Sequence, residues 1–585
     1  MRPSRSLTAA TIAGLVLAGL AVPPVAAAPA RPGPPDRTGV VEVRRVDRVP
    51  TPRLDWSPCY ENAECATVRL PLDYDEPHGP TTDVAVLRVK ARDQQQRIGS
   101  LFVNPGGPGG SGIELARSAP YFLGDEVLDR FDVVGFDPRG IGASEQVRCF
   151  RTTEEQAAAY AGMSVYFPWT RAEERAYETS SAAVGRACST TGRPISGAMS
   201  TAEVARDMEV LRRAVGDPKL NYLGFSYGSV LGQYYANMFP DRVRAVAIDG
   251  VLSGPSWVGR RGAAGTSQED RMRSGAGAHL ALREILDRCA KAGPTFCSLA
   301  AGDPAASFDL VARRLQAKPL IIEGPDGPFT FTYADFVANL LVGLYDPDGY
   351  VVVDMLTAEL LTLTDPGATA ARYASASTAL RRQLDRLREQ TPRSADDYQN
   401  GFEAFLGVDC TDAYHPASAR NWSTLADRAD RRDPYFGRPW TWNTSACARS
   451  SWTVRDEDAY TGPFDRRTIA PVLLVGNYWD PATAYQQAVR TARLLPNSRL
   501  LSSDSWGHSA YGTSACVNDA VDAYLLTGAL PAEGTVCVGD VQPFTPTPAG
   551  AATRRAGAGD DPAPGRGEPK RLPPVVAPLP VSTLG

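Results

Sequence analysis

The sequence lacks several features that mark particular classes of protein. Its 585 residues carry 61 Lys and Arg against 66 Asp and Glu, a formal net charge of −5. Nucleic-acid binding and polybasic membrane anchoring need an excess of positive charge, which is absent here. The chain also has no closely spaced C-x-x-C pairs of the kind that bind zinc. We therefore expect no nucleic-acid or membrane partner, no metal and no cofactor, whereas the oligomeric state stays open.

The N-terminal segment, residues 1–30, has the pattern of a secretory signal peptide. Arg2 and Arg5 precede an apolar stretch at 7–22, and a run of small residues closes the segment. The apolar stretch is shorter than the ~20 residues that span a bilayer. We therefore expect a cleaved signal peptide and a secreted, extracellular protein.

Ten cysteines agree with export, because an even number in an exported chain favours disulfide bonds. Sequence alone does not fix their pairing. The simplest pairing joins neighbours along the chain, since each consecutive pair falls within one segment. The expected pairs are Cys59–Cys65, Cys149–Cys188, Cys289–Cys297, Cys410–Cys447 and Cys516–Cys537.

Between the two ends of the chain, short apolar runs alternate with helical patterns such as 202–215 and 227–239. Strands alternating with helices predict an α/β fold, a mostly parallel sheet with helices on both faces. The runs that we expect to be buried strands are 98–103, 131–136, 220–223, 243–248, 471–475 and 498–502.

The alternation stops at residues 254–465, where the pattern is mainly helical. We expect an inserted helical domain that divides an α/β core into 51–253 and 466–540. Residues 31–50 are rich in Pro and Arg and are expected to be a linker or a pro-segment. The Pro-rich tail, 541–585, is expected to be disordered.

The only G-x-S-x-G match, Gly224–Gly228, places Ser226 between a predicted strand and a helical pattern. In a strand–turn–helix of this kind, glycines let the backbone turn so tightly that the serine hydroxyl projects alone. The alternative is a glycine-rich turn in which the serine is incidental. We predict that Ser226 is a catalytic nucleophile.

A serine hydroxyl needs a base to remove its proton and an acid to orient that base. Hydrolases of this topology order the three residues as serine, acid, histidine. Of the four histidines, one precedes Ser226 and two lie in the helical insertion, which leaves His508 as the base. Asp480 follows the strand predicted at 471–475 and is the favoured acid. Asp249, at the end of an earlier strand, is the competing candidate.

The loop Asn104–Gly112 follows a predicted strand and lies upstream of Ser226. A hydrolase takes oxyanion-binding N–H groups from a loop in this position and from the residue after the nucleophile. We therefore predict that the N–H groups of Tyr227 and Gly107 bind the oxyanion. The alternatives are a purely structural turn and a phosphate-binding loop, although the P-loop lysine is missing.

Five segments, in this order, resemble the secreted tripeptidyl aminopeptidase family of actinomycetes, α/β-hydrolases related to proline iminopeptidases: Asn104–Gly112, Asp137–Ser144, Gly224–Ser229, Asp480–Thr483 and Gly507–His508. The resemblance implies an α/β-hydrolase fold with an inserted helical lid. It also implies the same roles for Ser226, Asp480 and His508. The sequence departs from the family at Ser509, where relatives often have Gly, and in its Pro-rich tail.

The resemblance further implies a serine aminopeptidase that cuts peptides near a free N-terminus. Burying the substrate's ammonium requires a carboxylate partner, which we expect in the lid. Relatives carry an acidic residue shortly after the equivalent of Cys410, which favours Asp412 over Glu403 as the substrate-binding residue. The alternatives are a carboxylic ester hydrolase and a non-catalytic binding scaffold on the same fold.

Overall fold

The computed structural model describes residues 33–323, 327–389, 398–545, 570 and 572. The elements discussed below belong to one compact unit that begins at Pro35. The expected signal peptide and most of the expected tail lie outside the described residues. Within the described part, no helix combines the length and apolar character needed to cross a membrane.

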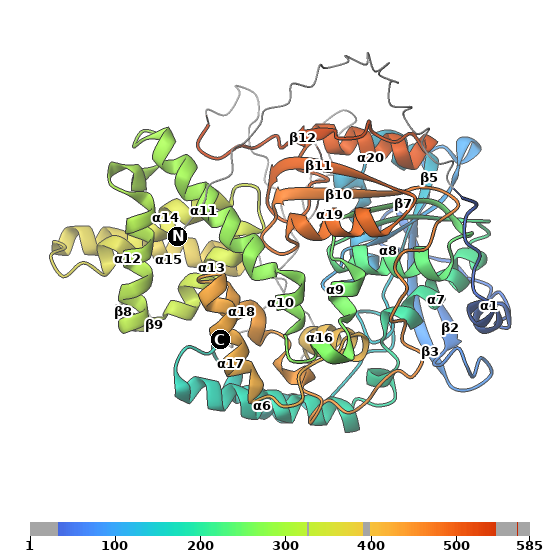
Figure 1. Cartoon of the computed structure of the whole chain (residues 1–585), viewed down its shortest axis with the longest axis horizontal. Helices are drawn as coiled ribbons and strands as arrows, with labels where there is room; N and C mark the ends of the chain where they lie inside the picture. Colours follow the sequence, from blue (N-terminus) through green and yellow to red (C-terminus); the bar gives the residue numbers. More distant parts are fainter. Residues whose placement is uncertain (1–32, 324–326, 390–397, 546–569, 571, 573–585) are drawn as a thin grey trace, which may run out of the picture. The chain divides into compact units, whose positions relative to one another are not determined.

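A ten-stranded sheet runs through this unit in the order β1-β2-β3-β5-β4-β6-β7-β10-β11-β12 (Figure 1). The pairs from β1 to β5 are antiparallel, and the pairs from β5 through β4 to β12 are parallel. The carboxyl ends of the parallel strands therefore meet at one edge, where α/β proteins place their sites. The strands are β1 Ser57–Cys59, β2 Ala63–Pro71, β3 Thr81–Val89, β4 Gly99–Asn104, β5 Phe131–Phe136, β6 Leu220–Phe225, β7 Val243–Asp249, β10 Val472–Trp479, β11 Ser498–Trp506 and β12 Val536–Val538.

All six predicted strands are present, which confirms the α/β fold class. Every residue of β4, β5 and β6 is buried, as expected for parallel strands covered on both faces. No strand is predicted from the sequence at β2 or β3. Strand β2 alternates buried residues with exposed polar ones such as Thr67 and Arg69, so it lacks a continuous apolar run. Strand β3 does contain one, the buried residues 84–87, which the prediction missed.

Helices cover both faces of the sheet. In β4, Phe102 packs into the core beneath α7, α8 and α19, whereas Leu101 and Val103 pack into the opposite core beneath α2, α3, α4 and α20. The alternation of side chains along a strand explains the two cores. The helices outside the insertion are α1 Val40–Asp47, α2 Gly112–Arg117, α3 Ala119–Phe122, α4 Asp125–Arg130, α5 Thr153–Tyr160, α6 Arg171–Thr190, α7 Thr201–Ala214, α8 Tyr227–Met238, α19 Tyr485–Leu494 and α20 Ala515–Thr527.

Between β7 and β10 the described chain is mainly helical, with one antiparallel pair, β8–β9 (Figure 1). Its helices bury a core of their own around Leu282, Phe308 and Leu340, and Trp506 of β11 belongs to the same cluster. The elements of this insertion are α9 Gly254–Val258, α10 Gln268–Met272, α11 Ser274–Ala292, α12 Pro304–Ala317, β8 Leu320–Ile322, β9 Phe329–Phe331, α13 Tyr333–Leu344, α14 Gly349–Leu363, α15 Ala370–Glu389, α16 Gly401–Asp412, α17 Asn421–Arg432 and α18 Gly437–Trp442.

All ten cysteines form disulfide bonds, and the pairing predicted from the sequence is confirmed. Each bond joins neighbours along the chain, with sequence separations from 6 to 39 residues. Cys410–Cys447 fixes the end of α16 to the segment that follows α18. The bonds therefore hold local segments rather than joining distant parts of the sequence.

Candidate active site

Ser226 lies at the sharp turn between β6 and α8. Its φ is 57° and its ψ is −123°, a conformation that a residue with a side chain rarely adopts. A Cβ built on Gly224 would lie 2.5 Å from the carbonyl oxygen of Gly228, and one built on Gly228 would lie 2.7 Å from the carbonyl oxygen of Asn104. These contacts leave room only for glycine, which explains the G-x-S-x-G spacing.

His508 and Asp480 follow the neighbouring strands β11 and β10, and their side chains are in contact. His508 Nδ1 lies 3.0 Å from each carboxylate oxygen of Asp480. The carboxylate also accepts backbone N–H bonds from Ala482, Thr483 and Ser509 at 2.8–3.0 Å. Burial alone raises the pKa of Asp480, but the charge of the His508 ring and these hydrogen bonds outweigh it and hold the pKa below its usual value. Asp480 can therefore stay ionised and orient the ring.

Gly250, directly after β7, lies between Ser226 and the His508 ring. A Cβ built on Gly250 would lie 3.3 Å from Ser226 N and 3.2 Å from His508 Cε1. The Nε2 atom of His508 is buried and has no hydrogen-bond partner among the described residues, including Ser226 Oγ. In enzymes without substrate such bonds are often long and tighten on binding. The serine and the free ring nitrogen thus flank the same glycine.

Asp249, the competing acid, binds the chain beyond His508 instead of the ring. Its Oδ2 accepts the N–H groups of Ala510 and Tyr511 at 2.9 and 2.7 Å, and its Oδ1 accepts that of Gly250 at 2.6 Å. Burial raises its pKa to about 6, against these hydrogen bonds. Asp249 therefore anchors the loop that carries His508.

Two further contacts hold this loop, through residues that were not predicted from the sequence. Asn477 in β10 donates from Nδ2 to the carbonyl oxygen of Gly507 at 2.8 Å. The backbone N–H of His508 donates to the carbonyl oxygen of Tyr345, in the insertion, at 2.9 Å. Asn477 had one signal in the sequence, since it is a polar residue near the end of a buried strand. Tyr345 had none.

The loop after β4 packs directly against the serine turn. A Cβ on Gly106 would lie 2.8 Å from both Ser226 Cβ and Tyr227 N. The N–H of Gly106 donates to Asn104 Oδ1 at 3.0 Å, whereas that of Gly107 has no acceptor among the described residues. The N–H of Tyr227, in the first turn of α8, has no acceptor within its own helix. The two amides predicted to bind an oxyanion are both available.

Asp412, the favoured substrate-binding residue, is 5% exposed and is linked to Tyr227 through Thr201. It accepts the backbone N–H of Thr201 at 2.8 Å, a short bond from the Thr201 hydroxyl, and Trp257 Nε1 at 2.8 Å. The Thr201 hydroxyl also lies 2.7 Å from the Tyr227 hydroxyl. Burial raises the pKa of Asp412 to about 6. Its carboxylate is thus occupied by donors from the protein.

Glu403, the second substrate-binding candidate, is fully buried and also has protein donors. It accepts the N–H of Cys149 and the Gln156 amide, each at 2.7 Å, and the Tyr398 hydroxyl at 2.8 Å. Burial raises its pKa. The contacts fasten the segment before α6 to α16. A role for either carboxylate in substrate binding stays a prediction.

Three groups of described residues bring possible metal ligands together. In one of them, Cys289 and Cys297 are joined as a disulfide and offer no thiolate. The other two groups share Asp458, and both lie in a set of carboxylates that already has arginine partners.

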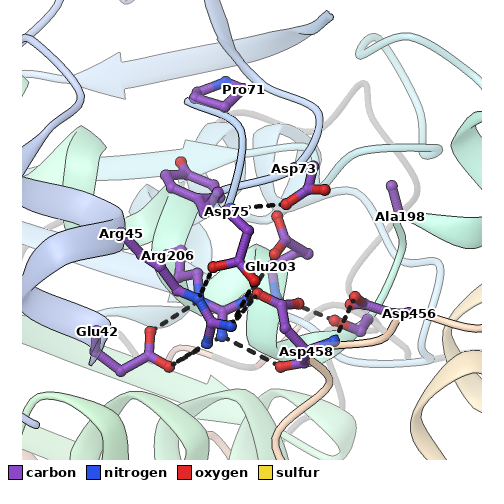
Figure 2. Close-up of polar contacts among 12 residues, drawn as sticks. Glu42, Arg45, Pro71, Asp73, Asp75, Ala198, Glu203, Arg206, Asp456 and Asp458 are labelled. Atoms are coloured by element: carbon purple, nitrogen blue, oxygen red, sulfur yellow. Dashed lines mark hydrogen bonds and ion pairs between the residues drawn. The ribbon is translucent and has the colours of Figure 1, made fainter. Parts of the chain in front are cut away.

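That set of carboxylates surrounds three arginines, Arg45, Arg139 and Arg206, and we call it the arginine network. Arg206 lies 2.6–2.8 Å from Glu203, Glu42 and Asp458. Figure 2 shows Arg45 and Arg206 side by side among these carboxylates. The ion pairs join α1 to α7 and to the segment before β10, so the expected linker at 31–50 contains a helix that is tied to the core.

Arg139 completes the arginine network on the other side of Glu203. Its side chain is 0% exposed and pairs with Asp207 at 2.6 Å and with Glu203 at 3.2 Å. It also donates to the backbone carbonyls of Pro71 and Leu72 at 2.9 and 2.7 Å. A buried guanidinium with this many acceptors holds the end of β2 against α7.

Three features define the class of this protein. They are the strand order, the strained serine turn after β6, and the histidine–carboxylate pair that follows β10 and β11. The protein is a serine hydrolase with the α/β-hydrolase fold. Comparison with protein families agrees, since residues 99–296 match the alpha/beta hydrolase fold family and residues 433–537 match the TAP-like protein family.

Individual relatives extend over most of the chain. The tripeptidyl aminopeptidase of Streptomyces coelicolor is 30% identical over 514 residues, 84% of this chain and 87% of the relative. Serine protease Hip1 of Mycobacterium tuberculosis is 30% identical over 83% of this chain and 91% of its own. Carboxylesterase B of the same organism is 32% identical over 91% of this chain and 98% of its own. The chain belongs to the tripeptidyl aminopeptidase family of α/β-hydrolases.

Proposed function

We propose that this protein is a secreted serine aminopeptidase that releases short peptides, of the tripeptidyl type, from free N-termini. The observation that carries the proposal is the contact between His508 and Asp480 beside the strained turn at Ser226. A serine with a base and an orienting acid is the machinery of acyl transfer. The named tripeptidyl aminopeptidase among the relatives supports the choice of a peptide substrate.

In the proposed reaction, His508 Nε2 takes the proton of Ser226 Oγ as Oγ forms a bond to the scissile carbonyl carbon. The N–H groups of Tyr227 and Gly107 donate to the oxyanion that develops. His508 then returns the proton to the leaving amine as the peptide bond breaks, and the N-terminal fragment remains as an ester on Ser226. Water loses a proton to His508 and attacks the ester carbonyl carbon. The bond from that carbon to Ser226 Oγ then breaks, His508 returns the proton to Oγ, and the fragment leaves with a carboxyl group, while Asp480 stays ionised and holds the ring.

The proposed function includes a domain organisation. Residues 254–465 act as a lid over the core formed by 51–253 and 466–540, and two contacts support this. Tyr345 of the insertion binds the His508 backbone, and Trp506 packs into the core of the insertion. Residues 1–30 direct export. The five disulfide bonds support that step, because they persist in oxidising compartments.

A carboxylic ester hydrolase is the second candidate function, favoured by the similarity to carboxylesterase B over nearly the whole chain. The same nucleophile, base and oxyanion donors would cleave an ester, so the catalytic residues do not separate the two functions. The distinction lies in what the lid binds. A peptidase of the proposed type must recognise an ammonium group, which an ester substrate need not carry.

The test compares three substrates of the mature protein: a tripeptide p-nitroanilide with a free N-terminus, its N-acetylated counterpart, and p-nitrophenyl acetate. We expect kcat/KM for the free peptide to exceed that for the acetylated peptide by at least ~10-fold, about 1.4 kcal/mol. Ser226→Ala is the control for contaminating activity. Equal cleavage of the two peptides, or cleavage of the ester alone, would rule out the aminopeptidase.

A further inference from the structure

The turn between α13 and α14, in the insertion, lies directly against the loop that carries His508. A Cβ built on Gly507 would lie 2.8 Å from the carbonyl oxygen of Tyr345 and 2.9 Å from the nitrogen of Pro347. The φ of Gly507 is 86°, which also favours glycine. The residue before His508 thus has no side chain, and the turn of the insertion occupies the space that a side chain would fill.

Hydrogen bonds within the turn fix its shape. The N–H of Asp346 donates to the carbonyl oxygen of Gly343 at 3.1 Å, and the N–H of Gly349, the first residue of α14, donates to that of Asp346 at 2.9 Å. The last carbonyl groups of a helix have no donor within it. The carbonyl of Tyr345, just after α13, is therefore free to accept the N–H of His508. The two helices that meet at this turn determine where Tyr345 lies.

The ring of Tyr345 packs against the ring of His508. Their centroids lie 4.9 Å apart and their planes meet at 62°, an edge-to-face contact of aromatic rings. The His508 side chain is 1% exposed, and its contacts with Asp480 hold Nδ1, at one edge of the ring. Rotation of a histidine ring about its Cβ–Cγ bond has only broad energy minima, so packing has to fix the tilt. Tyr345 supplies such a packing contact.

A second contact brings the insertion against the loop of the acid. A Cβ built on Gly277, in α11, would lie 2.5 Å from the carbonyl oxygen of Asp480. The insertion therefore packs on the backbone of the acid as well as on the ring of the base. Burial raises the pKa of Tyr345 well above its usual value, so its hydroxyl stays neutral. The contact of Tyr345 with His508 thus acts through packing rather than through charge.

We propose that Tyr345 is a positioning residue, whose ring holds the His508 ring where Nε2 can take the proton of Ser226 Oγ. The inference rests on the proposed function and deepens it. The insertion would then be part of the apparatus that activates the serine, in addition to covering the substrate. A reacting group displaced by about 1 Å can lower a rate by ~100-fold, so one packing contact on the base can have a large effect.

The position of the base matters in both steps of the proposed reaction. His508 takes a proton from Ser226 as the acyl-enzyme forms and from water as it breaks down. Neither transfer depends on the identity of the acyl group. Loss of the Tyr345 ring should therefore slow the cleavage of peptides and esters alike, through kcat. A residue that contacts the substrate would act differently, since it would affect the substrates that it binds and spare the others.

The test measures Tyr345→Leu, Tyr345→Met and Tyr345→Phe on the free tripeptide p-nitroanilide and on p-nitrophenyl acetate. The first two variants lose the flat ring but keep an apolar side chain. Each should lower kcat on the peptide by at least ~10-fold with KM within about 2-fold, and lower kcat/KM on the ester by a similar factor. Tyr345→Phe keeps the ring and should stay within about 2-fold of wild type. Tyr350→Leu is the matched control and should keep the wild-type kcat, because Tyr350 in α14 is also partly buried but its ring makes an edge-to-face contact with Phe544.

Each rate is divided by the concentration of Ser226 that a phosphonate labels, so only folded enzyme is counted. Wild-type kcat in both Tyr345→Leu and Tyr345→Met would overturn the inference and leave the proposed function standing. A rise in KM for the peptide alone would overturn it too, because Tyr345 would then contact the substrate. So would an equal loss in Tyr345→Phe, because the hydroxyl rather than the ring would then act. If Ser226→Ala keeps the wild-type activity, the proposed function itself fails.

Discussion

The arginine network and Glu269 of the insertion both bury carboxylates, but only those of the network have ion pairs with arginine. In the network, Arg206 pairs with three carboxylates, and Arg139 binds both oxygens of Asp207 and one of Glu203. Beside Glu269, Arg271 donates to backbone carbonyls and forms no ion pair among the described residues.

The difference separates ion pairs that hold the fold from groups of the proposed active site that have no partner. Ion pairs of the network join α1, α7 and the segment before β10, although Asp456, beside Asp458, forms no ion pair among the described residues. At the proposed active site, the buried Nε2 atom of His508 has no hydrogen-bond partner among the described residues. Substitutions in the first group should therefore change stability, and substitutions in the second should change activity.

The largest expected effect comes from the unpartnered side. Ser226→Ala and His508→Ala should each lower kcat by on the order of 10⁶-fold, because the residues of a catalytic triad act as a unit. The melting temperature should change little, since neither side chain is part of the arginine network. Thermal unfolding and steady-state kinetics on the free tripeptide p-nitroanilide measure the two quantities. Substantial residual activity in either variant would contradict the assignment.

Asp480→Asn sharpens the comparison within the active site. It should lower kcat by on the order of 10⁴-fold, because an amide favours the wrong tautomer of His508. Asp249→Asn serves as the counterpart, because Asp249 binds only backbone N–H groups near the ring. It should lower stability more than it lowers kcat. The opposite pattern of kcat values would make Asp249 the catalytic acid.

Arg206→Met tests the paired side. Removing this guanidinium leaves Arg139 as the remaining ion-pair partner of Glu203 and Arg45 as that of Asp458, and should lower the free energy of unfolding by about 3 kcal/mol. The kcat/KM of the folded fraction should stay at the wild-type value. Arg171→Ala is the matched control, because Arg171 forms an ion pair with Glu174 but its side chain is 72% exposed, so the loss of stability should be much smaller than for Arg206→Met. Chemical denaturation measures both, and equal losses would remove the distinction.

The smallest effect concerns the pH dependence of stability. Burial raises the pKa of Glu269 from 4.5 to about 8, so between these values the folded state keeps a proton that the unfolded state has released. Raising the pH through this range therefore favours unfolding. Glu269→Gln should match wild type near pH 4.5 and be more stable by about 1–2 kcal/mol near pH 8. Denaturation curves at the two pH values test this, and parallel curves for wild type and variant would contradict it.

The parallel half of the sheet was predictable, and the proposed catalytic residues could be selected, because their signals are local. A continuous apolar run predicts a strand buried on both faces, and Asp480 and His508 follow such runs closely. Strand β2 was not predictable in this way, since residues along it are alternately buried and exposed, whereas the apolar run 84–87 in β3 is a signal of the same kind that was missed. Helix α1 was missed as well, because its partners, Asp75 and Arg206, are distant in sequence.

The candidate substrate-binding carboxylates illustrate a deeper limit. Glu403 and Asp412 lie on one helix, and the sequence alone offers both as possible partners for an ammonium. Only the structure reveals that Cys149 and Tyr398 donate to Glu403 and that Thr201 and Trp257 donate to Asp412. Whether a carboxylate has a donor depends on residues from other parts of the chain, and no local pattern records it.

The hydrogen bond from the His508 backbone to the Tyr345 carbonyl has a consequence for the order of events in a catalytic cycle. Asp480 and Asn477 of the core hold His508 and its loop on one side, and Tyr345 of the insertion holds them on the other. Lifting Tyr345 away would release one side of the loop that carries the base. The serine would then be activated only when the substrate is enclosed. An open enzyme would be inactive, and Ser226 would not react with molecules that reach it from solvent.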